Sequence, residues 1–371
     1  MNRRYFDHNA TTPVAPQALE AMLPAMTEVY GNASSIHHFG QAARHLLDQS
    51  RATIARALNA ASPDEIVFTS GGTESDNLAI LGASKNGAAR NGHVITTSIE
   101  HPAVLSSVRA LSNATIVSVG SSGIVDPDDI RKAIRPDTTL ISVMHVNNEI
   151  GTVQPIAEIA KLGIPLHSDG VQAFGKLPID VRELGVALYS ISGHKIGAPK
   201  GIGALYVRKG TSLDPRQFGG RHERERRAGT ENVPGAVAFA RAATLDHTNT
   251  AALRNRLEQS ILDRIPRAQV NGAGSLRVGN TTNIRFDGID SDALLIALDL
   301  RGFAVSSGAA CSSGAPEPSH VLLALGLTRD QARSSIRFSL GRTNTQEDVD
   351  ALVDALVEAV AHLRKLSPVY V

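Results

Sequence analysis

The chain has 371 residues, 42% of them hydrophobic, which is enough to bury a full core in two medium domains or in one large domain plus a smaller one. Its 37 Lys and Arg residues balance 36 Asp and Glu residues, and the net charge of +1 argues against nucleic acid or an anionic membrane as a partner. A single cysteine excludes an intramolecular disulfide and a cysteine-based metal cluster, and it indicates a reducing compartment.

The sequence shows no export or membrane signal. The N-terminal residues MNRRYFDHNATT lack the apolar core of a signal peptide, and no run approaches the roughly 18 apolar residues of a spanning helix. We therefore expect a cytoplasmic protein without a metal site, whose partners are small molecules or other proteins.

The N-terminal two thirds of the chain predict an α/β fold. Leu19, Met22, Leu23 and Met26 recur at helical spacing. From residue 64 to about 208, helical patterns then alternate with short β-rich runs, which are EIVFTS, HVITTS, ATIVSV, TLISVMHV, IPLHSD, ALYSIS and GIGALYV. One of the helices should begin after Asp126, an N-cap residue followed by proline. Apolar strands separated by helices predict a largely parallel sheet that is covered on both faces.

The remainder of the chain predicts a smaller α+β domain. A helical stretch near Pro234 is followed by the strand patterns TTNIRFD, FAVSS and SSIRFSL, and by a final amphipathic helix from Glu347 to Leu363. The N-terminal segment should join this second unit. We therefore expect a large domain of residues 14–255 and a small domain of residues 1–13 and 256–371.

Five polar clusters come directly after predicted strands. They are Gly71-Gly72-Thr73-Glu74-Ser75, Glu100-His101, Asn147-Asn148-Glu149, Asp169-Gly170-Val171-Gln172 and Ser192-Gly193-His194-Lys195. Because the carboxyl ends of parallel strands border one crevice, we expect all five clusters to face the same pocket.

The first cluster is typical of a phosphate site. Gly71-Gly72-Thr73 lies between a strand and a helix, where free backbone N–H groups and the helix dipole favour an anion. A plain two-glycine turn is the alternative. The dinucleotide pattern GxGxxG and the nucleotide loop GxxxxGK[ST] are both absent here, so a monophosphate ester such as pyridoxal-5'-phosphate (PLP) fits better.

Lys195, Asp169 and His101 have the chemistry of a PLP site. Lys195 follows a buried strand, where a desolvated amine could form a Schiff base, although a surface loop lysine is the simpler alternative. Asp169 could keep the pyridine nitrogen protonated, or it could cap a helix. His101 could stack on the ring or transfer protons, or it could have a structural role.

These motifs resemble a known family, the fold-type I PLP enzymes of aminotransferase class V, and within it the NifS/IscS-like cysteine desulfurases. The resemblance extends over nearly the whole chain, in the blocks YFDHNATTP, GNASSIH, FTSGGTESDNLAI, EHPAV, HVNNEIGTVQPI, DGVQAFGKLPID, SGHKIGAPKGIGALYVR, GGRHERERRAGTENV, SSGAACSSGAPEPSHVL and SSIRFSLGRTNT. The sequence also departs from the family pattern, since Gly170 replaces a usual alanine after the aspartate.

The resemblance implies a role for each candidate site residue. Lys195 would carry PLP, His101 would stack on it and Asp169 would pair with its ring nitrogen. Asn148 and Gln172 would contact the ring hydroxyl region or the substrate. The phosphate would be held by Gly72, Thr73, Ser192 and His194, joined by Thr230 from the second subunit of a homodimer. Arg337 would bind the substrate carboxylate, for which a guanidinium group is suited.

The single cysteine, Cys311, is the implied sulfur acceptor. It lies in a glycine-bracketed stretch of small residues that predicts a mobile loop, although most lone cysteines are buried and inert. By resemblance, the enzyme converts L-cysteine to L-alanine and passes the sulfur from Cys311 to an iron–sulfur scaffold or another acceptor protein. The alternatives are another class V PLP enzyme, such as an aminotransferase or a selenocysteine lyase, and a non-catalytic sulfur carrier or scaffold subunit.

Overall fold

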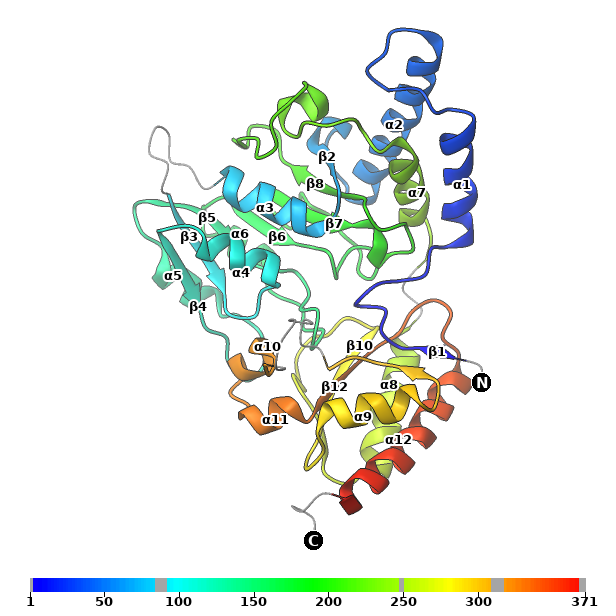
Figure 1. Ribbon diagram of the computed structural model, residues 1–371. Coiled ribbons are helices and arrows are strands. Elements are labelled where there is room, and N and C mark those ends of the chain that lie inside the picture. Colours follow the sequence, from blue (N-terminus) through cyan, green and yellow to red (C-terminus); the bar gives the residue numbers. More distant parts are fainter. Residues whose placement is uncertain (1–2, 84–91, 247–249, 308–316, 367–371) are drawn as a thin grey trace.

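The computed structural model describes residues 3–83, 92–246, 250–307 and 317–366, and it has two lobes (Figure 1). The upper lobe is built on a seven-stranded sheet, and the lower lobe contains the C-terminal helix α12 (Gln346–Leu366). The N-terminal segment passes between the lobes before it enters helix α1 (Pro16–Thr27).

The sheet of the upper lobe contains all seven strands that the sequence predicts, in the order β2-β8-β7-β6-β5-β3-β4. Their bounds are β2 Ile66–Thr69, β3 His93–Thr97, β4 Ala114–Val117, β5 Thr138–Ser142, β6 Leu166–Asp169, β7 Leu188–Ser192 and β8 Gly203–Val207. Every neighbouring pair is parallel except the two pairs that contain β8. The prediction of a mostly parallel sheet is therefore confirmed, with one reversed strand.

The reversal of β8 has a local cause. The connection from β7 to β8, residues 193–202, contains only a three-residue 3₁₀ turn, Gly193–Lys195. A parallel crossover needs roughly a dozen or more residues, usually with a helix, so the chain turns back beside β7. The turn leaves Lys195 at the same edge of the sheet as the ends of the parallel strands.

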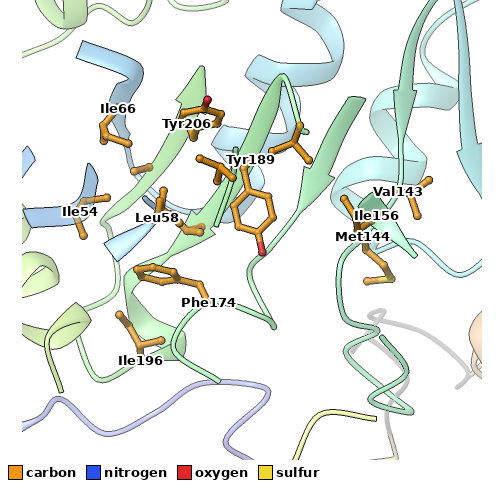
Figure 2. Packing of buried hydrophobic residues seen from close by; sticks show 14 of the residues in the cluster. Ile54, Leu58, Ile66, Val143, Met144, Ile156, Phe174, Tyr189, Ile196 and Tyr206 are labelled. Atoms are coloured by element: carbon orange, nitrogen blue, oxygen red, sulfur yellow. The ribbon is translucent and has the colours of Figure 1, made fainter. Parts of the chain in front are cut away.

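Helices cover both faces of the sheet, and alternate strand residues pack into different cores. Phe68 and Tyr206 pack on the side of α2 (His38–Ala57) and α7 (Val233–Ala243), where Figure 2 shows the surrounding side chains. Val67 and Leu205 pack on the side of α3 (Gly72–Ala83) and α4 (Pro102–Arg109). Helices α5 (Pro127–Ala133) and α6 (Ile156–Ala160) lie on the same side as α2 and α7, and Asp126 caps α5 as the sequence predicts.

The lower lobe has its own hydrophobic core. An antiparallel sheet in the order β12-β10-β9 packs against helices, and the N-terminal strand pairs in parallel with β11. The bounds are β1 Arg4–Tyr5, α8 Ala251–Arg264, β9 Ala268–Val270, β10 Thr281–Phe286, α9 Ser291–Asp299, β11 Phe303–Ala304, α10 His320–Ala324, α11 Arg329–Arg333 and β12 Ser335–Ser339. The sequence analysis identified three of these strands and missed β1 and β9, which are too short to show a period.

The domain division expected from the sequence stays a proposal. Its boundary near residue 255 falls inside α8, of which Leu257 and Ile261 pack in the lower core together with Phe6. The α10 residues Val321 and Leu322 pack instead in the core of the upper lobe, so the two units share a contact surface there.

Candidate active site

The predicted phosphate loop lies where β2 meets α3. Gly72 begins the helix, and a Cβ atom at this position would lie 2.7 Å from Val171 Cγ2 and 3.6 Å from Ser192 Cβ. Only glycine therefore allows the turn to approach the ends of β6 and β7 so closely. The backbone N–H groups of the first turn of α3 border the same space.

Lys195 lines the same space. Its Nζ atom donates hydrogen bonds to the backbone oxygens of Asn9 (2.5 Å) and Ala10 (2.8 Å), which belong to the N-terminal segment. Burial lowers the pKa of Lys195 to about 8, and the nearby charge of Arg337 contributes to the shift. A substantial fraction of the amine is therefore neutral, and able to attack a carbonyl carbon, at slightly alkaline pH.

Asp169 ends strand β6 and is 5% exposed. Its Oδ1 atom accepts a hydrogen bond from Val171 N at 2.9 Å. Burial raises the pKa of Asp169, whereas the charges of His101 and Lys195 lower it. A buried carboxyl group of this kind is stabilised in its charged form when a cationic partner comes close.

The glycine after Asp169 is required by its neighbour in the sheet. A Cβ atom on Gly170 would lie 2.1 Å from two ring carbons of Tyr189. Tyr189 is fully buried, packs in the core shown in Figure 2, and its hydroxyl lies 2.8 Å from His145 Nδ1. The departure from the family pattern at this position is therefore explained by the volume of the tyrosine ring.

His101 caps helix α4 and lines the same cavity as Asp169. Its Nδ1 atom accepts a hydrogen bond from Ala103 N at 3.1 Å, so the proton of the neutral ring resides on Nε2. Burial lowers the pKa of His101, and the carboxylate of Asp169 opposes this shift. The ring is thus held in one tautomer beside the cavity.

A cavity of about 200 Å³ brings together residues of all five predicted clusters. It is lined by Gly72, Thr73, Asp76, His101, Met144, Asn148, Asp169, Val171, Gln172, Ser192, His194 and Lys195. Asn148 Oδ1 and Ser192 Oγ are buried there without a hydrogen-bond partner among the described residues. Buried polar atoms are nearly always paired, so these two point to a polar ligand. The lining fits PLP, with an amine at one end and a glycine–helix turn at the other.

Arg337 lies beside the cavity and does not line it. On strand β12 it is 5% exposed, and its guanidinium donates to Asp7 Oδ1 (2.7 Å) and to the backbone oxygen of Asn148 (3.0 Å). Its Nε atom is buried without a partner among the described residues. These bonds use two of the five guanidinium N–H groups, and the buried Nε–H group is among those that remain for an anionic ligand.

Two predicted site residues remain, Thr230 and Cys311. Thr230 is exposed in the segment after β8, and Cys311 lies outside the described residues. The segment of Thr230 is attached to helix α2 and strand β2 by Glu223, which accepts two hydrogen bonds from the buried Arg51 (2.6 and 2.7 Å) and one from Phe68 N. Glu223, Arg224 and Glu225 all adopt positive φ angles of 47°, 57° and 64°.

Sequence reasoning missed several polar residues around the cavity. Asp76 lines it from α3, and burial together with the charge of Asp169 raises its pKa well above the usual value. Asp7, Asn9 and Lys176 are hydrogen-bonded to site residues from outside the lining. All four residues lie within blocks that carry the family resemblance, but nothing in their local pattern indicates a contact with the site.

Three comparisons place the chain among known proteins. Residues 4–352 match the family model for class-V aminotransferases. The cysteine desulfurase IscS of Methanosarcina thermophila is 46% identical over 98% of this chain and 93% of its own length, and the cysteine desulfurase of Gluconacetobacter diazotrophicus is 45% identical over 99% and 96%. A solved NifS-like protein superposes with a TM-score of 0.89 at 34% identity, covering 97% of this chain and all of its own. A structure described as SspA in complex with cysteine has a TM-score of 0.83 at 37% identity, over 92% and 100%.

Proposed function

Because the chain belongs to the class-V aminotransferase family, we propose that it is a PLP-dependent cysteine desulfurase, which converts L-cysteine to L-alanine and leaves a persulfide on Cys311. One observation carries this proposal: Lys195, Asp169 and His101 line a single cavity with the phosphate-type turn at Gly72. The reaction breaks the carbon–sulfur bond of cysteine, forms a sulfur–sulfur bond at Cys311 and adds a proton to the β-carbon, which becomes the methyl group of alanine.

The cofactor would be held at both ends of the cavity. Lys195 would attach PLP covalently, and Asp169 would bind the ring nitrogen. The phosphate would be bound by the first turn of α3 and by Ser192, with its unpartnered Oγ atom, and His194. When bound, PLP withdraws electrons from the bonds of the substrate carbon. Gln172 and Asn148 would hydrogen-bond the ring hydroxyl region or the substrate.

Arg337 would orient the substrate by its carboxylate. Its free Nε–H group is buried next to the backbone of Asn148, and its charge is balanced by Asp7 until an anion arrives. A guanidinium fork fixes the plane of a carboxylate, which a lysine cannot do. The amino group of cysteine would then point towards Lys195.

His101 would move a proton during the reaction. Because its Nδ1 atom accepts from Ala103 N, the neutral ring carries its proton on Nε2, and this atom can donate a proton but can accept one only after its own has left. Cys311 would need to lose its proton before it attacks sulfur, since a thiol is mostly protonated at neutral pH. We propose His101 as the partner in that proton transfer, which requires that Nε2 has first given up its own proton.

We further propose a homodimer in which Thr230 of one subunit completes the phosphate site of the other. The apolar stripe of α1 supports an interface, because Leu19, Leu23 and Met26 are 48%, 49% and 54% exposed although the sequence places them at helical spacing. A contiguous apolar face is typical of an association surface. Sedimentation of the wild-type chain and of Leu23→Glu should show a dimer and a monomer respectively, and the monomer should bind PLP more weakly.

The sulfur acceptor is proposed to be a protein, such as an iron–sulfur cluster scaffold. The chain's relatives are named for the desulfurase step only. Among the described residues no helix is long and apolar enough to cross a membrane. We propose a cytoplasmic location, where a persulfide and a scaffold protein can meet.

The decisive experiment is incubation with cysteine and a reductant, with sulfide and alanine measured together. Equal amounts of both products are expected from the wild type. Cys311→Ser should bind cysteine and keep the absorbance of bound PLP. It should form neither alanine nor protein-bound sulfane sulfur in a single turnover. A normal alanine yield from this variant would favour another class V reaction, and a colourless purified protein would favour the non-catalytic sulfur carrier.

A further inference from the structure

Asn9, in the N-terminal segment, connects the active site to the lower lobe, although the proposed mechanism assigns it no role. It is 2% exposed and lies in the turn between β1 and α1. Its side-chain oxygen accepts from Lys176 Nζ at 2.8 Å, and its backbone oxygen accepts from Gln172 Nε2 (3.0 Å) and Lys195 Nζ (2.5 Å). Asn9 therefore contacts two residues of the cavity lining directly.

These contacts fix the orientation of the Gln172 amide. Lys176 Nζ donates to Gln172 Oε1 at 2.5 Å, while Gln172 Nε2 donates to the Asn9 carbonyl. A flipped amide would place its oxygen against that carbonyl, and two acceptors repel each other. Burial lowers the pKa of Lys176 well below its usual value, but amine and ammonium can both donate. The second hydrogen of Nε2 thus stays available to the cavity.

The same segment receives the amine of Lys195. The carbonyls of Asn9 and Ala10 lie 2.5 and 2.8 Å from Nζ, which gives the amine a defined position at the edge of the cavity. In the proposed reaction the amine would be free while the substrate is bound, and these two carbonyls would hold it. A fixed position would spare the Lys195 side chain a search through its rotamers before it next reacts.

Asn9 is itself held by the lower lobe. Its backbone N–H donates to Ser339 Oγ (2.9 Å), and its side-chain Nδ2 donates to Thr281 Oγ1 (2.9 Å) and to the Asn148 carbonyl (3.1 Å). Asn280 Nδ2 donates to the side-chain oxygen at 3.1 Å. Every polar atom of Asn9 has a partner, so its carbonyl is kept in place.

We infer that Asn9 is a positioning residue of the proposed desulfurase reaction, on which this inference rests. Through Lys176 it holds the Gln172 amide with Nε2 towards the cofactor, and through its carbonyl it receives the free amine of Lys195. Its side chain does not touch the Lys195 amine, which Asn9 contacts only through its backbone oxygen.

The test is a pH titration of the absorbance of bound PLP in the holoenzyme without cysteine. In the proposed site Gln172 would donate a hydrogen bond to the cofactor, on which the protonation of the chromophore would depend. Asn9→Ala should therefore shift the titration midpoint by about one pH unit, the size of one lost hydrogen bond to an ionised group. Its kcat for alanine should fall about tenfold with little change in KM, because positioning acts on the reacting state.

Lys176→Met is the second variant. It keeps the bonds of Asn9 to the lower lobe and removes the Lys176 hydrogen bonds to Gln172 Oε1 and Asn9 Oδ1, so it should shift the midpoint in the same direction even if Asn9→Ala does not fold. Asn271→Ala is the matched control, because this buried asparagine bonds to Asn283 and Ser335 and not to the cavity. An unchanged midpoint in the folded site variants, or an equal shift in the control, overturns the inference. A wild type that forms no alanine would defeat the proposed function and leave this titration valid.

Discussion

Two groups of residues around the cavity differ in how their polar atoms are satisfied. In the strand-end cluster, which we define as Asn148, Asp169 and Ser192, two side-chain oxygens are buried without partners among the described residues. In the N-terminal segment, residues 7–10, every polar atom of Asn9 is bonded within the protein. The first group has the character of a binding surface, and the second has that of a support. Only the first should depend on the cofactor for its stability.

Lys195 joins the two groups, so removing it should have the largest effect. It follows the end of β7, and its amine rests on the N-terminal segment. Lys195→Ala is expected to produce no detectable alanine, because no other described lysine lines the cavity. The assay is alanine release over many turnovers, and release at the wild-type rate would show that Lys195 is not the attachment point.

The lowered pKa of Lys195 should make the cofactor-free protein more stable at alkaline pH. Burial lowers this pKa from 10.5 to about 8, so between these values the unfolded chain binds a proton that the folded chain does not. Stability therefore rises with pH across this window, by at most about 3 kcal/mol. Urea unfolding of the cofactor-free wild type and Lys195→Met at pH 8 and pH 10 measures the effect. A parallel dependence in both proteins would contradict it.

Asp169→Asn tests the binding role of the strand-end cluster. The carboxylate is expected to give the ring nitrogen a charge-assisted hydrogen bond of about 1.5–3 kcal/mol. Its loss should slow alanine formation roughly 10- to 100-fold, while PLP still binds. Stopped-flow absorbance after cysteine is added follows the step, and an unchanged rate would exclude the role.

The smallest effects are expected from one substitution in the strand-end cluster and one beside Asn9 of the N-terminal segment, which together compare the two groups. Ser192 Oγ has no partner among the described residues, so Ser192→Ala should leave the stability of the cofactor-free protein unchanged and weaken PLP binding about fivefold, or about 1 kcal/mol. Thr281 is fully buried and bonds to Asn9 and Asn280, so Thr281→Val should cost about 1–3 kcal/mol of stability. Its effect on PLP affinity should be smaller than that of Ser192→Ala. The reverse pattern would remove the distinction between the groups.

The strand-end residues could be predicted because each follows a strand with a strong local pattern. Six of the seven strands run in the same direction, so a polar residue after most of them is brought to one edge of the sheet. The placement of Asp169, His101 and Lys195 around one cavity follows from that rule. Their chemical roles, and those of Thr230 and Arg337, stay proposals.

The supporting residues could not be predicted, because their contacts join distant parts of the chain. Asn9 meets Gln172 and Thr281 only after the two lobes have come together. A periodicity analysis reports on neighbours within about ten positions, and it has no information on such pairs. The reversal of β8 was missed for a different reason, since it depends on the length of a connection and not on the strand itself.

The buried pair of Arg51 and Glu223 has a consequence for the order of folding. Its two residues are 172 positions apart, and Phe68 of strand β2 also donates to Glu223. Contacts of such long range form slowly, because the chain between them must first be ordered. Until they form, the segment that carries Thr230 cannot take up its left-handed turn. A refolding chain would therefore order the segment of Thr230 late, and in the proposed homodimer it would become able to pair with a second chain only in the last phase.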